Sequence, residues 1–170
     1  MNPSRFAYFA ALLMICLLAT GAIAQDTAAP AKKDGDPRIQ TALDKLKYKY
    51  TVNGNKAYEL TFDLKEKRSQ LVFINSTTQT FSKMEMREIT STAYKVKGKI
   101  PADQALRLLA DNDKRVWGSW RTVEEGDFTY VVYAVQLPAD ASAETLDKAI
   151  DAVMYTADDM EKEITKADDF

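Results

Sequence analysis

The chain has no histidine, and this absence excludes much of the common chemistry of enzymes. Histidine is the usual general base, the commonest zinc ligand and the usual activator of a serine nucleophile. Glycine is also sparse, and its six copies show no spacing typical of a phosphate-binding loop. We therefore expect neither a histidine-dependent hydrolase nor a nucleotide-binding protein, and we predict no catalytic, cofactor-binding or metal-binding residue.

Cysteine occurs once, at Cys16, inside an apolar stretch near the N-terminus. Ile15 stands before it, where a bacterial lipoprotein signal has a small residue, so we do not expect lipid attachment. The rest of the chain has no thiol, so its stability must come from apolar burial and hydrogen bonds. The net charge is −2 at pH 7, which argues against nucleic acid as a partner, because its binding proteins concentrate positive charge.

The first 24 residues have the pattern of a secretory signal peptide. Arg5 precedes an apolar run over residues 6–19, and Ala22 and Ala24 form a small-x-small cleavage site. The run has about 14 residues, short of the ~20 that span a bilayer, so we expect no membrane span after cleavage. These features predict an exported protein, periplasmic or secreted, with a mature chain starting at Gln25. Residues 25–36 lack periodic apolar positions and predict a disordered linker.

Three segments predict helices from their caps and apolar spacing. Asp36 and Pro37 suit the N-cap and first position of one helix, Pro101 begins a second that ends near Asn112, and Ser142 can cap a third. The third helix has apolar residues at spacings of four and three: Leu146, Ile150, Val153, Ala157, Met160 and Ile164. Such a stripe occurs only once in the chain, so we favour packing of this helix on a sheet over a coiled coil.

Alternation and strand-forming residues predict the sheet. The expected strands lie near residues 48–52, 58–64, 69–74, 86–96, 116–122 and 128–136, while residues 75–84 predict a loop. The last two strands are apolar on both faces, so we place them in the middle of the sheet. The resulting fold is α+β, in one domain over residues 37–166: an antiparallel sheet of five to six strands with N- and C-terminal helices packed on it, in the order α-β-β-β-β-α-β-β-α.

Turn lengths predict which side chains share a face, because a slip of one residue exchanges the two faces of a strand. A three-residue loop at Asn53 to Asn55 pairs Tyr50 with Tyr58. An even loop over residues 65–68 pairs Leu60 with Phe73. This register directs Phe73 and Leu71 into the core and turns Val72 and Ile74 to the opposite face. An even turn in the last hairpin pairs Trp120 with Val131, also in the core.

A second apolar face is the one feature of the sequence that suggests a partner. Its predicted members are Val72, Ile74, Trp117, Tyr130 and Val132. Two explanations remain open: another part of the chain, such as the helix at Pro101, covers this face, or it binds a protein, a peptide or a second copy of the chain. The second explanation makes these five residues the candidate partner-binding site.

Without histidine, only a carboxylate site for calcium or magnesium would remain, and the acidic pairs do not support one. The candidates are Asp111 with Asp113, Asp158 with Asp159, and Asp168 with Asp169, and none has EF-hand spacing. Adjacent side chains on a helix diverge by about 100°, so Asp158 and Asp159 point apart. The alternatives to an interaction module are a hydrolase that uses carboxylates alone, with or without calcium, and a structural envelope protein.

The order of elements resembles the YbjN family, whose domain has a fold like that of type III secretion chaperones. The segments that suggest it are LLADN at 108–112, GSW at 118–120, the apolar strand to the LP at 137–138, and ADDME at 157–161. The resemblance covers roughly residues 37–166. It implies a non-enzymatic interaction module, chaperone-like or regulatory.

Overall fold

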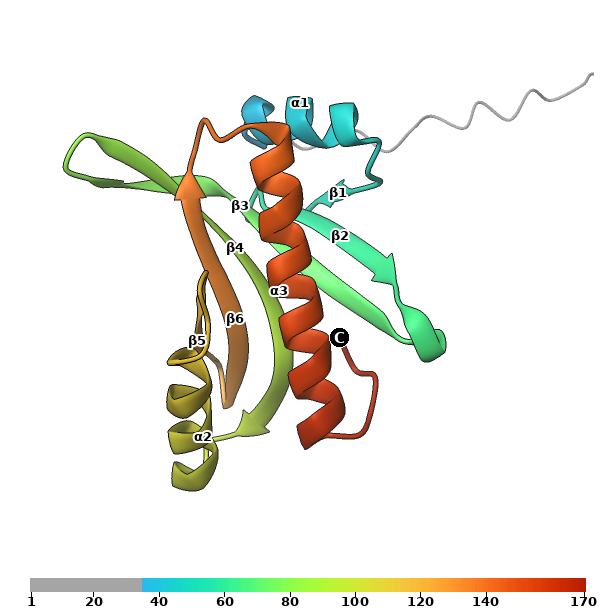
Figure 1. Ribbon diagram of the computed structural model, residues 1–170, viewed down its shortest axis with the longest axis vertical. Coiled ribbons are helices and arrows are strands. Elements are labelled where there is room, and N and C mark those ends of the chain that lie inside the picture. Colours follow the sequence, from blue (N-terminus) through green and yellow to red (C-terminus); the bar gives the residue numbers. More distant parts are fainter. Residues whose placement is uncertain (1–34) are drawn as a thin grey trace, which may run out of the picture. The chain divides into compact units, whose positions relative to one another are not determined.

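One antiparallel sheet of six strands carries three α-helices in the computed structural model, which describes residues 35–170 (Figure 1). The order is α1 (Pro37–Leu46), β1 (Thr51–Val52), β2 (Tyr58–Asp63), a short 3-10 helix (Lys65–Lys67), β3 (Ser69–Phe81), β4 (Met84–Lys97), α2 (Ala102–Asn112), β5 (Ser119–Glu125), β6 (Phe128–Pro138) and α3 (Ala143–Ile164). This confirms the α+β class and the predicted order. The predicted signal peptide and residues 25–34 of the predicted linker lie outside the described residues.

The helices begin where their capping residues predict. Asp36 accepts a hydrogen bond from the Arg38 amide at 2.9 Å, and Ser142 accepts one from the Thr145 amide at 3.1 Å. Pro101 precedes α2, as expected at a position that needs no amide hydrogen. Side-chain caps thus replace the missing hydrogen-bond acceptors of the first turns of α1 and α3.

The strands lie in the order β1-β2-β3-β4-β6-β5, so β6 is internal and β5 is an edge strand. The prediction of a central position is right for β6, of which seven consecutive residues from Thr129 to Val135 are at least half-buried. It is wrong for β5, where only Trp120 is buried. Trp120 pairs with Tyr133 rather than with Val131, a shift of two residues that leaves Trp120 on the core face as predicted.

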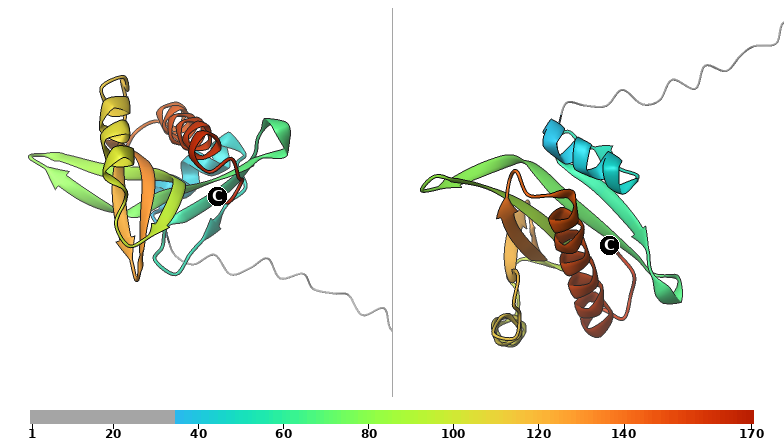
Figure 2. Two further views of the ribbon diagram at one scale, coloured as in Figure 1. Left: turned by 90° about the horizontal axis from the view of Figure 1, so that it is seen from below. Right: turned by 45° about the horizontal axis from the view of Figure 1, so that its top comes forward.

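The helices gather on one face of the sheet, which we call the inner face. α3 packs on β3, β4 and β6, α1 contacts α3, and α2 contacts β5 (Figure 2). The core between these layers includes the buried stripe of α3 together with inner-face residues of the strands: Tyr58, Leu60, Val72, Ile74, Ile89, Val131, Tyr133 and Val135. The opposite, outer face has no helix over it among residues 35–170.

The register of β2 and β3 differs from the prediction by one residue. Leu60 pairs with Val72 and Tyr58 with Ile74, so Val72 and Ile74 are the core residues of β3, both 0 % exposed. The cause is the connection between the strands, which has five residues rather than four because Asp63 pairs with Ser69. The odd loop turns Leu71 and Phe73 to the outer face.

Residues 75–84, predicted as a loop, continue the β3–β4 hairpin instead. Phe81 pairs with Met84 across a two-residue turn, and the hairpin extends beyond the rest of the sheet in Figure 1. The segment has no apolar alternation because the sheet has no core at its tip, where Phe81 is 72 % exposed. Backbone pairing and several threonines are sufficient to form strands there.

Candidate functional site

Two of the five residues predicted to bind a partner are core residues. Val72 and Ile74 lie beneath α3 with no exposed surface, so neither can contact a partner while the protein is folded. This corrects their assignment to the second face, and its cause is the odd β2–β3 connection described above. The corresponding outer-face residues of β3 are Leu71 and Phe73, both half-buried.

The other three predicted residues do not form an open apolar patch, and Trp117 packs against the core cluster. Tyr130 and Val132 share the outer face of β6, and Val132 is only 6 % exposed. Trp117 precedes β5, where its indole N–H donates to the Gln136 carbonyl at 3.3 Å. Arg121 of β5 reaches over β6 to an ion pair with Glu88 of β4, so a charged pair crosses this face.

Exposed apolar side chains gather instead around α2 and β5. They are Leu106 and Leu109 on α2, Val116 in the following loop and Val123 on β5, with exposed fractions of 67 %, 64 %, 104 % and 42 %. A groove of about 410 Å³ runs between the two elements. Its lining is mostly apolar: Ile100, Ala105, Leu108, Leu109, Asn112, Trp120, Arg121 and Thr122. We call it the α2–β5 groove.

The C-terminal end of α2 is fastened to β5 by side chains that hold the groove's shape. The carboxylate of Asp111 accepts hydrogen bonds from the Trp120 indole at 2.7 Å and from Arg115 at 2.8 Å. Burial alone would raise the pKa of Asp111, but these two donors outweigh it and hold the pKa below its usual value. Gly118 turns the chain into β5 with φ of 96°, where an added Cβ would lie 2.7 Å from the Ala134 carbonyl oxygen.

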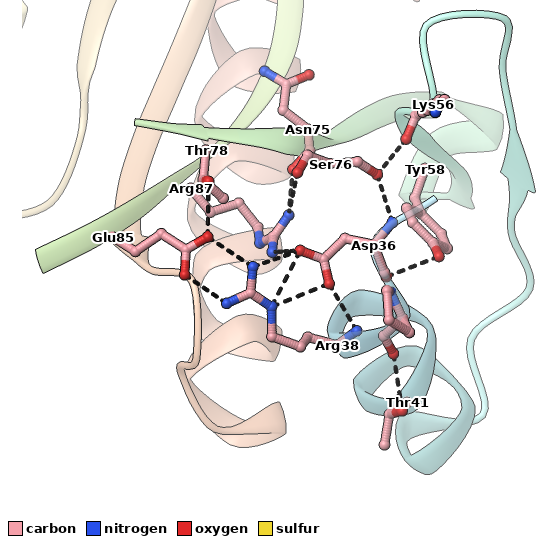
Figure 3. A network of polar contacts seen from close by, with 11 residues as sticks. Asp36, Arg38, Thr41, Lys56, Tyr58, Asn75, Ser76, Thr78, Glu85 and Arg87 are labelled. Carbon is pink, nitrogen blue, oxygen red and sulfur yellow. Dashed lines mark hydrogen bonds and ion pairs between the residues drawn. The ribbon is translucent and has the colours of Figure 1, made fainter. Parts of the chain in front are cut away.

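A second group of polar contacts joins the start of α1 to the β3–β4 hairpin (Figure 3). The buried Arg87 donates to the carbonyl of Asn75 at 2.6 Å and to the carboxylate of Asp36 at 2.5 Å. Arg38 joins Asp36 to Glu85 on the hairpin. The register of β3 against β4 shifts between Ile74 and Thr78, and Arg87 provides a hydrogen-bond donor for a carbonyl there. The network therefore has a structural role.

A third group of polar contacts, centred on Arg68, holds the C-terminal residues after α3 against the fold. Arg68 donates to Asp158 at 2.6 Å, to Glu161 at 2.9 Å and to the carbonyl of Ala167 at 2.5 Å. Asp168 accepts a hydrogen bond from the Ser69 amide at 3.0 Å. Residues up to Asp169, beyond the predicted domain end at 166, therefore bond to the fold.

The acidic residues considered as metal ligands are distributed among these groups. Asp111 bonds to Trp120 and Arg115, while Asp158 and Asp168 belong to the Arg68 cluster. Within residues 35–170, no three acidic side chains are arranged to hold a metal ion. In the same part of the chain, no helix is long and apolar enough to cross a membrane.

The sequence prediction does not include the groove, because it gives the helix at Pro101 only as a possible cover for the sheet. A usable signal was present in the sequence: Leu106, Leu108 and Leu109 span more of a helix circumference than one contact with a sheet edge can bury. Only Leu108 is buried in α2. The remaining leucines thus indicate a helix that lacks cover on one side.

Of three comparisons with known proteins, only the one with solved structures found a match. No known family profile matches the sequence, and no curated protein matches it. Among solved structures, the chain is similar to the crystal structure of YbjN from E. coli, with a TM-score of 0.47 and 12 % sequence identity, over 78 % of this chain and 94 % of that one. Membership of the YbjN family stays a prediction.

Proposed function

We propose that this protein is an exported, non-enzymatic interaction module that binds a protein or peptide at the α2–β5 groove. The observation that supports the proposal is the concentration of exposed apolar side chains at one place, beside an apolar groove. Leu106, Leu109 and Val116 are each more than 60 % exposed within one short stretch of chain. Grouped exposed apolar residues of this kind are typical of association surfaces, whereas single ones are common on any protein.

Export is part of the proposal and is supported by the signal-peptide pattern of the first 24 residues. The non-enzymatic character is supported by the absence of histidine and of any thiol after residue 24. The groove itself carries no carboxylate, hydroxyl pair or amine arranged for acid–base work: Thr122, Asn112 and Arg121 are its polar lining residues. Its chemistry suits recognition.

Site-specific photocrosslinking in the native host tests the proposal. A benzoylphenylalanine placed at Leu109 or Thr122, both of which line the groove, lies at the groove, while one placed at Tyr155, which is 55 % exposed on α3, lies away from it. We expect discrete protein adducts from the two groove positions and none from Tyr155. The proposal fails if the groove positions give no adduct, or if Tyr155 gives the same adducts.

A calcium titration separates the module from the rival hydrolase. A ligand that binds only the folded state raises the unfolding midpoint. Because no three acidic side chains of residues 35–170 are arranged to hold a metal ion, we expect calcium to leave the thermal midpoint unchanged. An upward shift that a chelator reverses would favour the calcium-dependent alternative.

A further inference from the structure

The hydrogen bonds of Trp120 show which backbone groups of β5 face the open edge of the sheet. The Trp120 amide donates to Asn112 Oδ1 at 2.6 Å, and its carbonyl accepts from Asn112 Nδ2 at 3.4 Å, so both groups point away from β6. Peptide groups alternate in direction along an antiparallel strand. Thr122 and Glu124, two and four residues further on, therefore also direct their N–H and C=O groups to this edge.

Asn112 already occupies one position on the edge in the way that a neighbouring strand would. Its side-chain amide has both a carbonyl acceptor and N–H donors, as a peptide unit has a C=O and an N–H. The contact closes the edge at Trp120, where α2 ends, but the α2–β5 groove continues along Thr122. No side chain of residues 35–170 pairs in this way with the backbone of Thr122 or Glu124.

We propose that the α2–β5 groove binds an extended peptide segment of another protein as a seventh strand, paired with the backbone of β5 at Thr122 and Glu124. The inference rests on the proposed function and specifies its ligand and its mode of binding. Addition of a strand to an exposed edge is a recurrent mode of peptide recognition, in which backbone hydrogen bonds supply affinity and side-chain pockets supply specificity. The volume of about 410 Å³ lies within the usual range of ligand sites.

The side chains around the edge indicate which peptides fit. Successive residues of an added strand point to opposite faces of the sheet. On the inner face they meet Leu108, Leu109 and Trp120 of the groove, and on the outer face they meet Val123, which is 42 % exposed. A segment with apolar residues at alternate positions therefore complements the groove.

A single extended segment suits this edge better than a second copy of the chain. In a second copy, the same edge of β5 is flanked by its own α2. Pairing two β5 edges would bring two α2 helices into one gap, whereas a lone segment has no such flank. Self-association through this edge is therefore an outcome that would contradict the proposal.

The test uses the purified protein and a fluorescein-labelled peptide of seven residues, with leucine and threonine alternating between terminal lysines. Thr122→Pro removes the outward amide hydrogen without affecting the pairing with β6, since proline is tolerated on a strand edge where its nitrogen faces solvent. Thr122→Ala is the matched control, because it removes the same side chain and keeps the amide. Leu109→Lys alters the groove wall, and Tyr155→Lys on α3 is its control, because Tyr155 is also exposed, at 55 %, but does not line the groove.

We expect fluorescence anisotropy to show saturable binding that is about tenfold weaker for Thr122→Pro and for Leu109→Lys, equivalent to ~1.4 kcal/mol, and unchanged for both controls. A peptide methylated on every backbone nitrogen should also bind about tenfold more weakly to the unmodified protein, and this comparison needs no variant that might misfold. Circular dichroism checks that each variant is folded.

Three results of the binding measurements would overturn the proposal: no saturable binding to the unmodified protein, equal binding by Thr122→Pro and Thr122→Ala, or equal binding of the methylated peptide. A dimer of the unmodified protein that Thr122→Pro abolishes in sedimentation would also overturn it, because the edge would then belong to a second copy. If Leu109 crosslinks to a protein in the host while Thr122→Pro changes nothing, the proposed function stands and strand addition is wrong.

Discussion

At the scale of single residues, Asp36 performs two functions that are separable by substitution. Its carboxylate caps α1 and also lies between the guanidinium groups of Arg38 and Arg87. Burial opposes ionisation of this carboxyl, but hydrogen bonds from both arginines outweigh burial and hold its pKa well below the usual range. A carboxyl with a lowered folded-state pKa stabilises the fold above the unfolded pKa, and this contribution is lost as the pH falls.

We expect Asp36→Asn to keep the cap, since asparagine is also a preferred N-cap residue, and to lose the charge beside the buried Arg87. The free energy of unfolding should fall by about 2–3 kcal/mol at neutral pH, because Arg87 stays buried without its carboxylate. The difference from the unmodified protein should shrink as the pH falls from about 5 to about 2. Urea unfolding at a series of pH values measures this; the exposed Asp140→Asn is the control, and a difference that stays constant with pH would contradict the assignment.

Ile74 and Phe73 provide the direct test of the β2–β3 register. Ile74 is 0 % exposed beneath α3, whereas Phe73 lies half-buried on the outer face. We expect Ile74→Ala to cost about 2–5 kcal/mol of stability and Phe73→Ala about 1 kcal/mol. Urea unfolding of the two variants, compared at equal m-values, measures both losses. A larger loss of stability for Phe73→Ala would support the register expected from the sequence instead.

At the scale of elements, α3 combines the predicted apolar stripe with a buried charge that sequence spacing does not show. Leu146, Ile150 and Val153 lie in the core, as does the carboxylate of Glu161, which is 0 % exposed. Burial raises the pKa of Glu161, against the opposing effects of the Asp169 amide and Arg68. Because the pKa of Glu161 is higher in the folded state than in the unfolded state, its contribution to stability is complete below the unfolded-state pKa. This contribution is lost as the pH rises through the folded-state pKa.

Removal of Arg68 should therefore destabilise the protein more at high pH than at low pH. We expect Arg68→Met to cost about 3–5 kcal/mol near pH 8, where Glu161 would be charged without its partner, and less near pH 5, where Glu161 can take up a proton. Adding Glu161→Gln to Arg68→Met should recover part of the loss. Urea unfolding of the single and double variants at both pH values tests this, and equal losses without recovery would show that Glu161 is not the group responsible.

At the scale of the whole molecule, the compartment depends on residues 1–24. We expect the protein isolated from its host to begin at Gln25, because Ala22 and Ala24 form the cleavage pattern. Intact-mass measurement of the native protein decides this. A mass that includes residues 1–24 would contradict export with cleavage, although it would leave the α2–β5 groove unaffected.

Local signals in the sequence were sufficient for the helices and for the class of fold. Asp36, Pro101 and Ser142 mark helix starts because capping depends on hydrogen bonds within one turn. The stripe on α3 identifies its buried side because a helix repeats every 3.6 residues wherever it packs. The strand order and the edge position of β5 depend on pairings between distant segments, whereas the apolar residues of the last two strands predicted a central position for both.

The sequence by itself determined the order of the elements, the positions of the helix caps, the apolar stripe on α3, and the absence of histidine and thiol chemistry. Each of these is local or compositional. Only the tertiary structure decided the face of Val72 and Ile74, since one extra residue in the 64–68 connection exchanges the two faces of β3. It also decided that Leu109 is left exposed and that the backbone of Thr122 faces an open edge. Both depend on where α2 ends against β5, through the contact of Asn112 with Trp120, and no local pattern in the sequence encodes that contact.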